Sequence, residues 1–513
     1  MKTKITIILI CCIALFACSE KDIIPNQKEK PGQGDKSNMQ YGIRWQIGNN
    51  NDLGEHCFDA EGLKASFGVG STPGTSDFDS IYPWSEVKRC NLRKEGGKTI
   101  ITYDNEPGFS LDGNNGDVFV RIPKFYVKKY SENGYEYRVI SAKGTKPHPA
   151  FIENGKEIDA VYISAFEGYI DENGKMRSIA DKIPTSNIVP KQFLDAAKAR
   201  GRGYTLYDMR TLDMLYTLVA VEFGCRNTGV IFGHGIADFR QPIEKEWDKE
   251  QTYYSTKNEK KTNSITCKRQ WRDVIIEGSN ICICNGSQKD ILTFAKCTSK
   301  KKRKKTETYY FDGPAIDINT DCFIGNCAQR TNWTETCTAP HNSKTGRANM
   351  VTPHLTTENR NPMRYRWIEN IVGNIWHLMP DVTFKDLQMY VCDNIDDYEM
   401  YKTELPYRKV GEPLPENNDN GDFILIDRPG KNFWITSLID NPAISFGKEW
   451  NKNLTSRQAF GAYYYLSKGL TIIANGGGFD HGYRCNMLTN RAWIRSDKKW
   501  HLYGARLIYK PIE

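Results

Sequence analysis

Histidine is scarce in this chain, with eight residues among 513. No pair of histidines stands at the spacing of a His-Glu-x-x-His zinc helix, and no Ser, His and Asp are ordered as in a hydrolase triad. The Gly476 to Gly478 run is not followed by a helical pattern, so it is not a dinucleotide loop. Cys282-Ile283-Cys284 and the Cys322 and Cys327 pair lack His partners at zinc spacing. We therefore expect no cofactor and no bound metal.

Apolar runs long enough to cross a bilayer are also missing. The run from Ile5 to Phe16 follows two lysines and is too short for a permanent span, which is typical of a cleaved signal peptide. Leu15-Phe16-Ala17-Cys18 is similar to a lipobox, so we expect a signal peptide over 1–17 and acylation of Cys18; an ordinary signal peptide cleaved nearby is the alternative. Residues 18–40 are mostly Lys, Gly, Gln, Pro and Ser, which favours a flexible tether.

The sequence has one long run of residues with charge of the same sign. The formal net charge is +8, and Lys300-Lys301-Lys302-Arg303-Lys304-Lys305 contributes six positive charges between two strand-like segments. Such a cluster can bind nucleic acid, but a solvated hairpin tip in an exported protein is the simpler interpretation, and we expect no nucleic-acid partner. Once Cys11, Cys12 and Cys18 are set aside, the remaining cysteines are even in number, so disulfides are possible, but their spacing fixes no pairing.

Short apolar runs separated by Asn-Gly turns predict strands over much of the chain. Tyr41–Ile47, Thr99–Tyr103, Asp117–Val127 and Asp159–Phe166 are the clearest. Two helices are predicted after them. Pro190 opens the first and Gly201 ends it; Thr205, with Asp208 three residues on, marks the start of the second, which ends near Gly224.

We divide the chain into an N-terminal β region over 41–115 and a larger domain over 116–513, the stretch over which the resemblance given below extends. Residues 241 to about 312 are charged and rich in cysteine, so we interpret them as an insertion in that domain.

Four short motifs resemble those of a known fold branch. Ile371-Val372-Gly373-Asn374-Ile375-Trp376-His377 is similar to the Gly-Asn-Val-Trp-Glu-Trp box of the formylglycine-generating, or sulfatase-modifying, branch of the C-type lectin fold. Gly203–Asp208, Asn475–Phe479 and Gly504–Leu507 resemble other runs of that branch, in the same order. The resemblance implies an α+β, C-type-lectin-like domain of short strands, long loops and two helices. Its structural positions would be Gly373, Asn374, Trp376, Gly476, Gly477, Gly504 and Arg506.

The enzymes of that branch hold copper through two closely spaced cysteines, but the matching interval here contains only Cys485, and His377 stands where the branch usually has Glu. A single thiolate cannot form a two-sulfur copper site. We therefore expect that the chain is not an enzyme. A closer resemblance, carried by Gly504-Ala505-Arg506-Leu507 and by the segments Tyr82–Cys90, Leu111–Gly113 and Gly116–Tyr126, is to the variable proteins of diversity-generating retroelements and related phage tail receptor-binding proteins.

In that family the residues between the glycine turn and the closing Gly-Ala-Arg-Leu form a variable binding face. The same interval here is rich in Tyr, Trp, Arg, Asn and Asp, residue types that dominate binding surfaces. The predicted ligand contacts are Asp480, His481, Tyr483, Arg484, Asn486, Asn490, Trp493, Arg495, Asp497 and Lys499. Trp376, Trp500 and Tyr503 are expected to be core residues.

These observations predict a surface-exposed outer-membrane lipoprotein that binds a protein or glycan ligand through a C-terminal surface, which we expect to be diversified. The alternatives are an exported enzyme of the formylglycine-generating type and a phage tail adhesin.

Overall fold

The computed structural model describes residues 38–47, 53–67, 74–239, 241–243, 252–270, 275–332, 348–349, 362–411, 413, 423–425, 427–428, 431–432, 434–441, 444–451, 464–482 and 485–512. Asn38–Glu513 forms one compact unit. The predicted signal peptide, the predicted acylation site at Cys18 and nearly all of the predicted tether lie outside the described residues.

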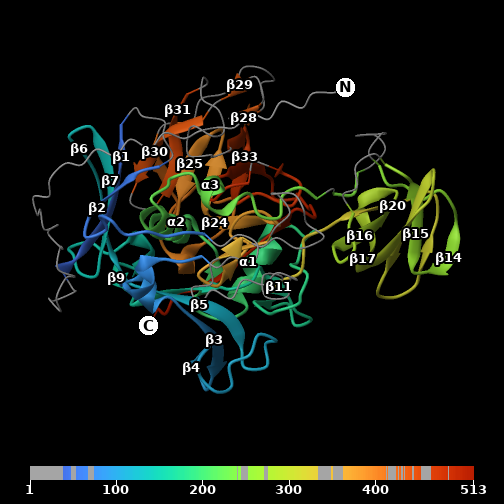
Figure 1. The fold of residues 1–513 in the computed structure, drawn as a ribbon, viewed down its shortest axis with the longest axis horizontal. Helices are drawn as coiled ribbons and strands as arrows, with labels where there is room; N and C mark the ends of the chain where they lie inside the picture. The colour runs from blue at the N-terminus through green and yellow to red at the C-terminus, as the bar shows by residue number, and fades with distance from the viewer. Residues whose placement is uncertain are drawn as a thin grey trace, which may run out of the picture. The chain divides into compact units, whose positions relative to one another are not determined.

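A six-stranded sheet joins early and late parts of the chain, in the order β13-β36-β10-β5-β3-β4. Its strands β3, β4 and β5 are labelled in Figure 1. Strand β36 lies between β10 and β13, through the pairs Tyr162↔Tyr509 and Thr205↔Ile508. The strands are β3 (Lys88–Glu95), β4 (Lys98–Tyr103), β5 (Asp117–Pro123), β10 (Ala160–Ser164), β13 (Tyr204–Leu206) and β36 (Leu507–Tyr509).

Two hydrophobic cores lie on the two faces of this sheet. Val118, Val120 and Ile122 of β5 enter one core and Phe119 enters the other, as expected for side chains that alternate along a strand. Helix α2 (Met209–Phe223) contributes to the first core and α1 (Pro190–Lys198) to the second. The sheet is therefore covered on both faces, which is why β5 is buried almost throughout.

The helices begin and end near the predicted positions. Pro190 is the first residue of α1, and Gly224, with φ of 64°, caps the end of α2. The predicted start of α2 needs one correction: Asp208, not Thr205, is the N-cap, because its carboxylate accepts from the Thr211 backbone N–H at 2.7 Å. A short third helix, α3 (Thr228–Phe232), follows.

An eight-stranded sheet carries the C-terminal segment. Its path is β26-β25-β24-β33-β34-β32-β27, and β35 adds to β24 in parallel through Trp376↔Tyr503. The strands are β24 (Trp376–Lys385), β25 (Gln388–Val391), β26 (Arg408–Val410), β27 (Phe423–Leu425), β32 (Tyr464–Ser467), β33 (Leu470–Asn475), β34 (Asn490–Ile494) and β35 (Tyr503–Gly504).

The segment interpreted as an insertion forms a sheet with its own core. The order is β15-β18-β17-β16-β20, with the pair β14–β19 beside it in the chain, and the sheet continues past the predicted boundary to Asn326. Ile265, Ile283, Tyr309 and Ile324 are among its buried residues. The strands are β14 (Glu259–Thr262), β15 (Ser264–Lys268), β16 (Asn280–Asn285), β17 (Ser287–Lys302), β18 (Thr306–Phe311), β19 (Ile316–Ile318) and β20 (Cys322–Asn326).

The remaining strands form smaller sheets. A four-stranded sheet has the order β2-β1-β7-β6, and short ladders join β8–β9, β11–β12, β21-β22-β23, β28–β29 and β30–β31. Their bounds are β1 (Gln40–Gln46), β2 (Glu55–Phe58), β6 (Tyr126–Glu132), β7 (Tyr135–Ser141), β8 (Ile152–Glu153), β9 (Lys156–Glu157), β11 (Tyr169–Ile170), β12 (Met176–Arg177), β21 (Ala348–Asn349), β22 (Met363–Tyr365), β23 (Ile368–Glu369), β28 (Asp427–Arg428), β29 (Lys431–Asn432), β30 (Trp434–Asn441) and β31 (Ile444–Asn451).

The predicted α+β, C-type-lectin-like class is wrong. Among the described residues, strand makes up 41% and helix 12%, so this part of the protein is mainly β, with its strands spread over several separate sheets. The motifs behind the prediction specify glycine turns and buried aromatic residues locally, and such short runs do not determine the order of strands. Within the described ranges, no helix is long and apolar enough to cross a membrane.

Candidate functional site

The segment between β33 and β36 begins with a turn that requires glycine. Gly476 and Gly477 have φ of 92° and 89°, a backbone region that L-residues rarely adopt. A Cβ on Gly477 would lie 2.3 Å from the Cys485 Sγ atom. Cys485 is buried, and its thiol donates to the Gly478 carbonyl at 3.4 Å. The turn and the buried thiol together fix where the following residues start.

Arg491 of β34 lies among three tryptophan rings. Its guanidinium carbon is 4.5 Å from the ring centroid of Trp493, 5.0 Å from that of Trp500 and 5.7 Å from that of Trp376. Trp493 and Trp500 meet edge to face at 6.2 Å. Cation–π attraction and ring packing hold the planar guanidinium in one place. We call these four residues the Arg491 cage.

A histidine and a carboxylate extend the polar contacts of Arg491. His481 Nε2 lies 3.2 Å from an Arg491 Nη1 atom, and His481 Nδ1 lies 2.7 Å from Asp480 Oδ1. Because a guanidinium can only donate, His481 Nε2 accepts, which leaves the ring proton on Nδ1, facing Asp480. Burial would raise the pKa of Asp480, but its contacts with His481 outweigh burial and lower that pKa. The three side chains therefore form one oriented chain of polar contacts.

Charged side chains surround the outer edge of the cage. Arg495, Asp497 and Lys499 are exposed, while Trp493 and Trp500 are partly exposed. Lys498 Nζ lies 5.0 Å from the Trp493 ring centroid. Burial lowers the pKa of Lys498, and the positive charges of Lys289 and Arg491 lower it further. The edge of the cage is therefore an aromatic surface with an excess of positive charge.

The structure places the predicted contact residues in three different settings. Asp480, His481 and Trp493 lie at the cage, and Arg495, Asp497 and Lys499 lie on the surface beyond it. Tyr483 and Arg484 lie outside the described residues.

Asn486 and Asn490, also predicted as ligand contacts, are buried and have no surface open to a ligand. The Asn486 Oδ1 atom accepts from the Thr228 hydroxyl at 2.9 Å, and Asn490 Oδ1 accepts from the Asn475 amide at 3.0 Å. Both amides satisfy buried polar groups, a structural role that a list of polar residues in sequence does not reveal.

The predicted contact set omitted Arg491 and His501. Arg491 stands two residues before Trp493 in an extended run, which places both side chains on one face of a strand; this signal could have identified it. His501 Nε2 lies 2.9 Å from the Gln241 Oε1 atom, a contact between distant segments that no local pattern indicates. Burial lowers the pKa of His501 to about 4, so this histidine is neutral near pH 7.

The motif residues form the buried floor below the cage. Gly373 has φ of 78°, and a Cβ there would lie 2.8 Å from the His234 and Ile236 backbone. Trp376 is fully buried, and a Cβ on Gly504 would lie 2.6 Å from Ile375. Arg506 is buried and donates to the Ser164 carbonyl at 2.7 Å. These residues hold backbone segments together and, being buried, offer no surface to a ligand; Trp376 takes part in the cage only through its contact with Arg491.

Glu167 and His377 form a buried pair in this floor. Glu167 Oε1 lies 3.5 Å from His377 Nε2, and the Asn374 amide donates to Glu167 Oε2. Burial, which outweighs the Arg506 charge and the Asn374 hydrogen bond, raises the pKa of Glu167 to about 8. Burial and Arg506 hold the pKa of His377 well below its usual value. Both groups are therefore neutral in the folded protein near pH 7.

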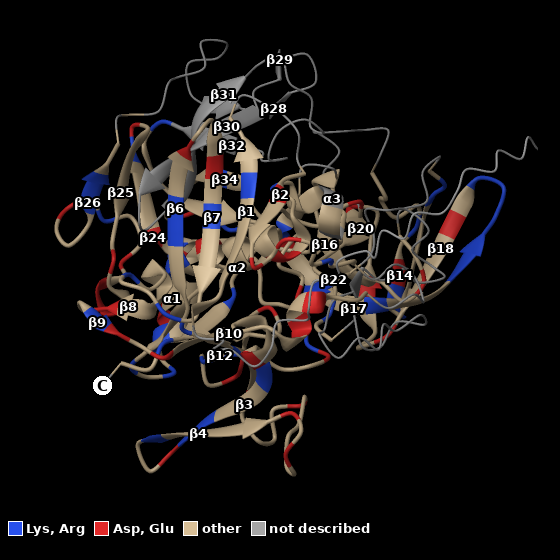
Figure 2. Cartoon of the chain, turned by 60° about the vertical axis from the view of Figure 1, so that its left-hand side comes forward, with Lys and Arg blue, Asp and Glu red and all other residues tan. Residues whose placement is uncertain are grey.

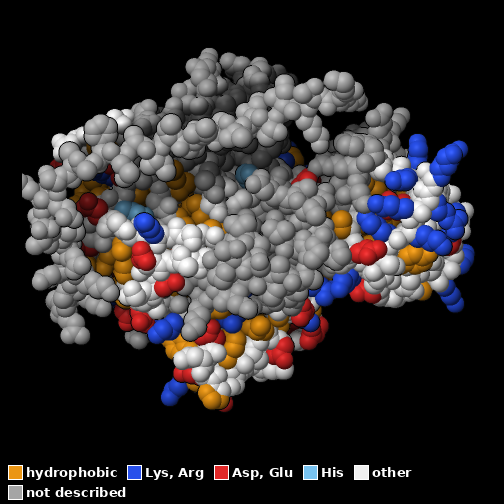
Figure 3. Space-filling view, viewed as in Figure 1, with side chains coloured by type: hydrophobic (Ala, Val, Ile, Leu, Met, Phe, Trp, Pro, Cys, Tyr) orange, Lys and Arg blue, Asp and Glu red, His pale blue; other side chains and the backbone are white. Residues whose placement is uncertain are grey.

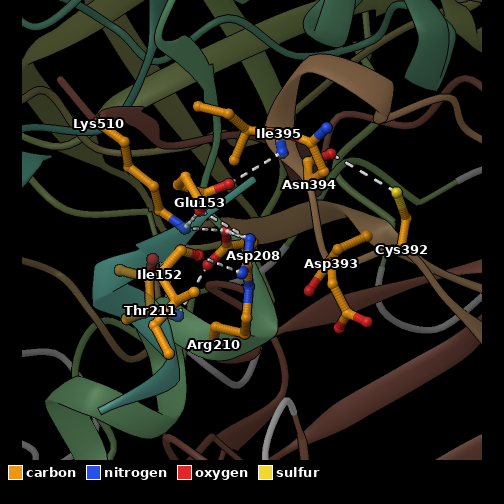
Figure 4. A network of polar contacts seen from close by, with 12 residues as sticks. Ile152, Glu153, Asp208, Arg210, Thr211, Cys392, Asp393, Asn394, Ile395 and Lys510 are labelled. Carbon is orange, nitrogen blue, oxygen red and sulfur yellow. Dashed lines mark hydrogen bonds and ion pairs between the residues drawn. The ribbon is translucent and has the colours of Figure 1, made fainter. Parts of the chain in front are cut away.

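A second buried network ties the last residues of the chain to α2 (Figure 4). Lys510 Nζ lies 2.7 Å from Glu153 Oε1 and 2.9 Å from Asp208 Oδ2, and Arg210 also pairs with Glu153 at 2.8 Å. Burial would raise the pKa of Asp208, but Lys510 and Arg210 outweigh it and lower that pKa strongly. All four side chains are buried, so the network is structural.

The part of the chain that the structure describes offers no set of metal ligands. No group of three or more His, Cys, Asp or Glu residues there is arranged to hold a metal ion. The Arg491 cage offers instead a fixed cation, aromatic ring edges and a hydrogen-bonding rim, which are means of binding.

No family model matches the sequence. A stretch of 133 residues, 25% of the chain, is 26% identical to part of the DNA polymerase of Choristoneura biennis entomopoxvirus. The match spans 13% of the length of that polymerase. Because the similar protein is an enzyme, the match contradicts the expectation of a non-enzymatic protein, and we withdraw that expectation. So small a share of the polymerase transfers no activity to this chain.

Proposed function

We propose that the protein is a lipid-anchored protein of the bacterial outer membrane, and that the Arg491 cage and its rim bind a protein or glycan on another cell or particle. The observation that carries the proposal is the fixed position of Arg491 among Trp376, Trp493 and Trp500. Arg and Trp contribute much of the binding energy at interfaces, and a side chain already fixed in place loses little entropy when it binds.

The rim supports the same proposal. Arg495, Asp497 and Lys499 are exposed within ten residues of Arg491 and can form hydrogen bonds or ion pairs with a partner without disturbing the core. The floor residues Gly373, Trp376 and Gly477 are fixed by packing. A fixed floor with replaceable rim residues is an arrangement in which sequence changes alter the ligand and leave the fold intact.

The proposal includes diversification of this segment by a retroelement. The supporting observation is the likeness of the motifs to variable proteins, and the test is genomic. We expect a reverse transcriptase gene and a near-copy of the 3′ end of this gene in the same genome, with differences at adenines. If neither is present, diversification is excluded while ligand binding remains open to the next test.

Binding is tested on a glycan array and on a panel of intact bacterial cells. The Arg495→Ser/Asp497→Ser/Lys499→Ser variant should lose at least about tenfold in affinity for whatever the wild type binds, since each contact at an interface contributes on the order of 1 kcal/mol. Arg491→Lys keeps the charge but loses the planar group, and should also weaken binding.

The matched control for the rim variant is Lys98→Ser/Glu172→Ser/Lys175→Ser, which alters exposed charges of the same signs on other elements. It should bind as the wild type does. Equal affinity of the rim variant, Arg491→Lys and the wild type would reject the cage as the binding site.

A further inference from the structure

The hairpin β17–β18 ends in a strongly basic tip that the proposed ligand site does not use. Lys301, Lys302, Arg303, Lys304 and Lys305 are all exposed. The Arg303 backbone N–H donates to the Thr306 carbonyl at 2.8 Å, so Lys304 and Lys305 form the turn itself. Figure 2 shows this concentration of basic residues at the turn. The tip is thus a tight, convex turn.

Further basic residues lie beside the tip. The Arg269 backbone N–H donates to the Lys305 carbonyl at 3.0 Å, which places Arg269 next to the turn, and both Lys268 and Arg269 are exposed. Figure 3 shows lysine and arginine side chains gathered over the region of β14 to β20.

The acidic residue nearest the tip in sequence does not balance this charge. Glu307 pairs with Lys302 in the strand register but is 3% exposed, and the Tyr309 hydroxyl donates to its Oε2 atom at 3.2 Å. Glu277 Oε1 accepts from the Lys300 backbone at 3.0 Å, and Lys300 Nζ donates to the Ile275 carbonyl at 3.1 Å. Lys300 is therefore engaged within the protein, whereas Lys301, Arg303, Lys304 and Lys305 carry exposed positive charge at the tip.

An exposed tyrosine lies next to the basic residues. Tyr310 is 39% exposed and pairs with Ser299 in the ladder, three strand positions from Lys302 and Glu307, or about 10 Å at the rise of a β-strand. Tyrosine is enriched where proteins meet the headgroup region of a bilayer, because its ring is apolar and its hydroxyl is polar.

We propose that this tip docks on a bilayer of anionic phospholipid. Clusters of about four to eight Lys and Arg attract anionic headgroups, and the attraction acts within a Debye length of the surface. A convex turn can bring all its charges to a plane at once. A single nucleic-acid strand is instead held in a groove with several stacking rings, and Tyr310 is the one exposed ring close to this tip among the described residues of β17 and β18.

The experiment is flotation of the full-length protein with vesicles of phosphatidylcholine, with and without phosphatidylglycerol. An N-terminal anchor would bind both kinds of vesicle, so the measured quantity is the preference for the anionic ones. The wild type should partition at least about tenfold more strongly to anionic vesicles at low salt, and the preference should vanish at high salt. The Lys301→Gln/Arg303→Gln/Lys304→Gln/Lys305→Gln variant should lose it at low salt as well.

The matched control is Lys98→Gln/Lys156→Gln/Lys175→Gln/Lys191→Gln, which removes the same charge from exposed positions elsewhere. It should retain the preference. A wild type without preference, or a tip variant that keeps it, overturns the proposal. Binding of a single-stranded oligonucleotide that depends on the tip, without vesicle binding, also overturns it and assigns the surface to nucleic acid. These outcomes are independent of the Arg491 cage, which no variant here alters.

Discussion

At the scale of single residues, buried charges hold together segments that are far apart in the chain. Lys510 is fully buried and contacts Glu153 and Asp208, so one ammonium group connects the end of the chain to two earlier segments. Glu167 is the opposite case, a buried carboxyl group beside a neutral histidine. The two groups predict different responses to mutation and to pH.

Lys510→Met should destabilise the fold by about 3–5 kcal/mol, because it leaves two buried carboxylates short of a partner. Lys191→Met is the matched control: Lys191 pairs with Asp195 at 2.7 Å, but the two side chains are 71% and 54% exposed. An exposed pair contributes about 0–1 kcal/mol. Urea unfolding measures both changes, and a loss of similar size in the two variants would contradict the structural role of Lys510.

Glu167 makes stability depend on pH. Its pKa is raised to about 8, so its contribution is complete below the pKa of the unfolded chain and is lost as pH rises toward 8. The lowered pKa of His377 has the opposite effect: it makes the free energy of unfolding rise with pH, and only at and below the ordinary histidine pKa near 6.5. Between about pH 6.5 and 8.5, of these two groups only Glu167 therefore changes the stability with pH.

Over that window the wild type should lose roughly 2 kcal/mol of stability relative to Glu167→Gln, because one unit of pKa corresponds to about 1.4 kcal/mol. Chemical denaturation at several pH values measures this difference in stability. The contributions of the other titrating groups are the same in both proteins and therefore cancel. Parallel curves for the two proteins would show that Glu167 is already ionised in the fold.

At the scale of elements, the glycine turn after β33 positions the whole candidate site. Gly477→Ala should cost about 2–4 kcal/mol, since it adds backbone strain and a Cβ 2.3 Å from the Cys485 Sγ atom. Gly482→Ala is the control, because its φ is also positive, at 58°, but no atom lies within 4 Å of the added Cβ. Thermal unfolding compares them; equal losses would mean that strain alone matters.

Element boundaries were predicted where the signal is local. The Pro190 start and the Gly224 cap were recognisable because each depends on one residue type with a fixed backbone preference. The cage could not be predicted in full, since Trp376 comes from β24, Arg491 from β34 and Trp500 from the loop before β35. The prediction of the fold class was wrong for the same reason, because strand order depends on pairings such as Tyr162↔Tyr509 that no short motif encodes.

At the scale of the whole molecule, the proposal of a lipid-anchored protein depends on Cys18, which lies outside the described residues. Metabolic labelling with a fatty acid should mark the wild type, and Cys18→Ala should abolish the label. Cys57→Ala is a suitable control, because Cys57 is a partly buried free thiol in the body of the protein. Label that persists in Cys18→Ala would contradict the proposed anchor.

The position of strand β36 in the sheet limits which mutations of the gene the fold can tolerate. It follows the candidate site in the chain, yet it lies between β10 and β13 in the six-stranded sheet. A ribosome must therefore translate the entire candidate site in frame before that sheet can close. Any insertion or deletion that shifts the reading frame within the site leaves β10 and β13 without their shared neighbour. Such chains would misfold and be degraded, so the fold itself selects for in-frame substitutions.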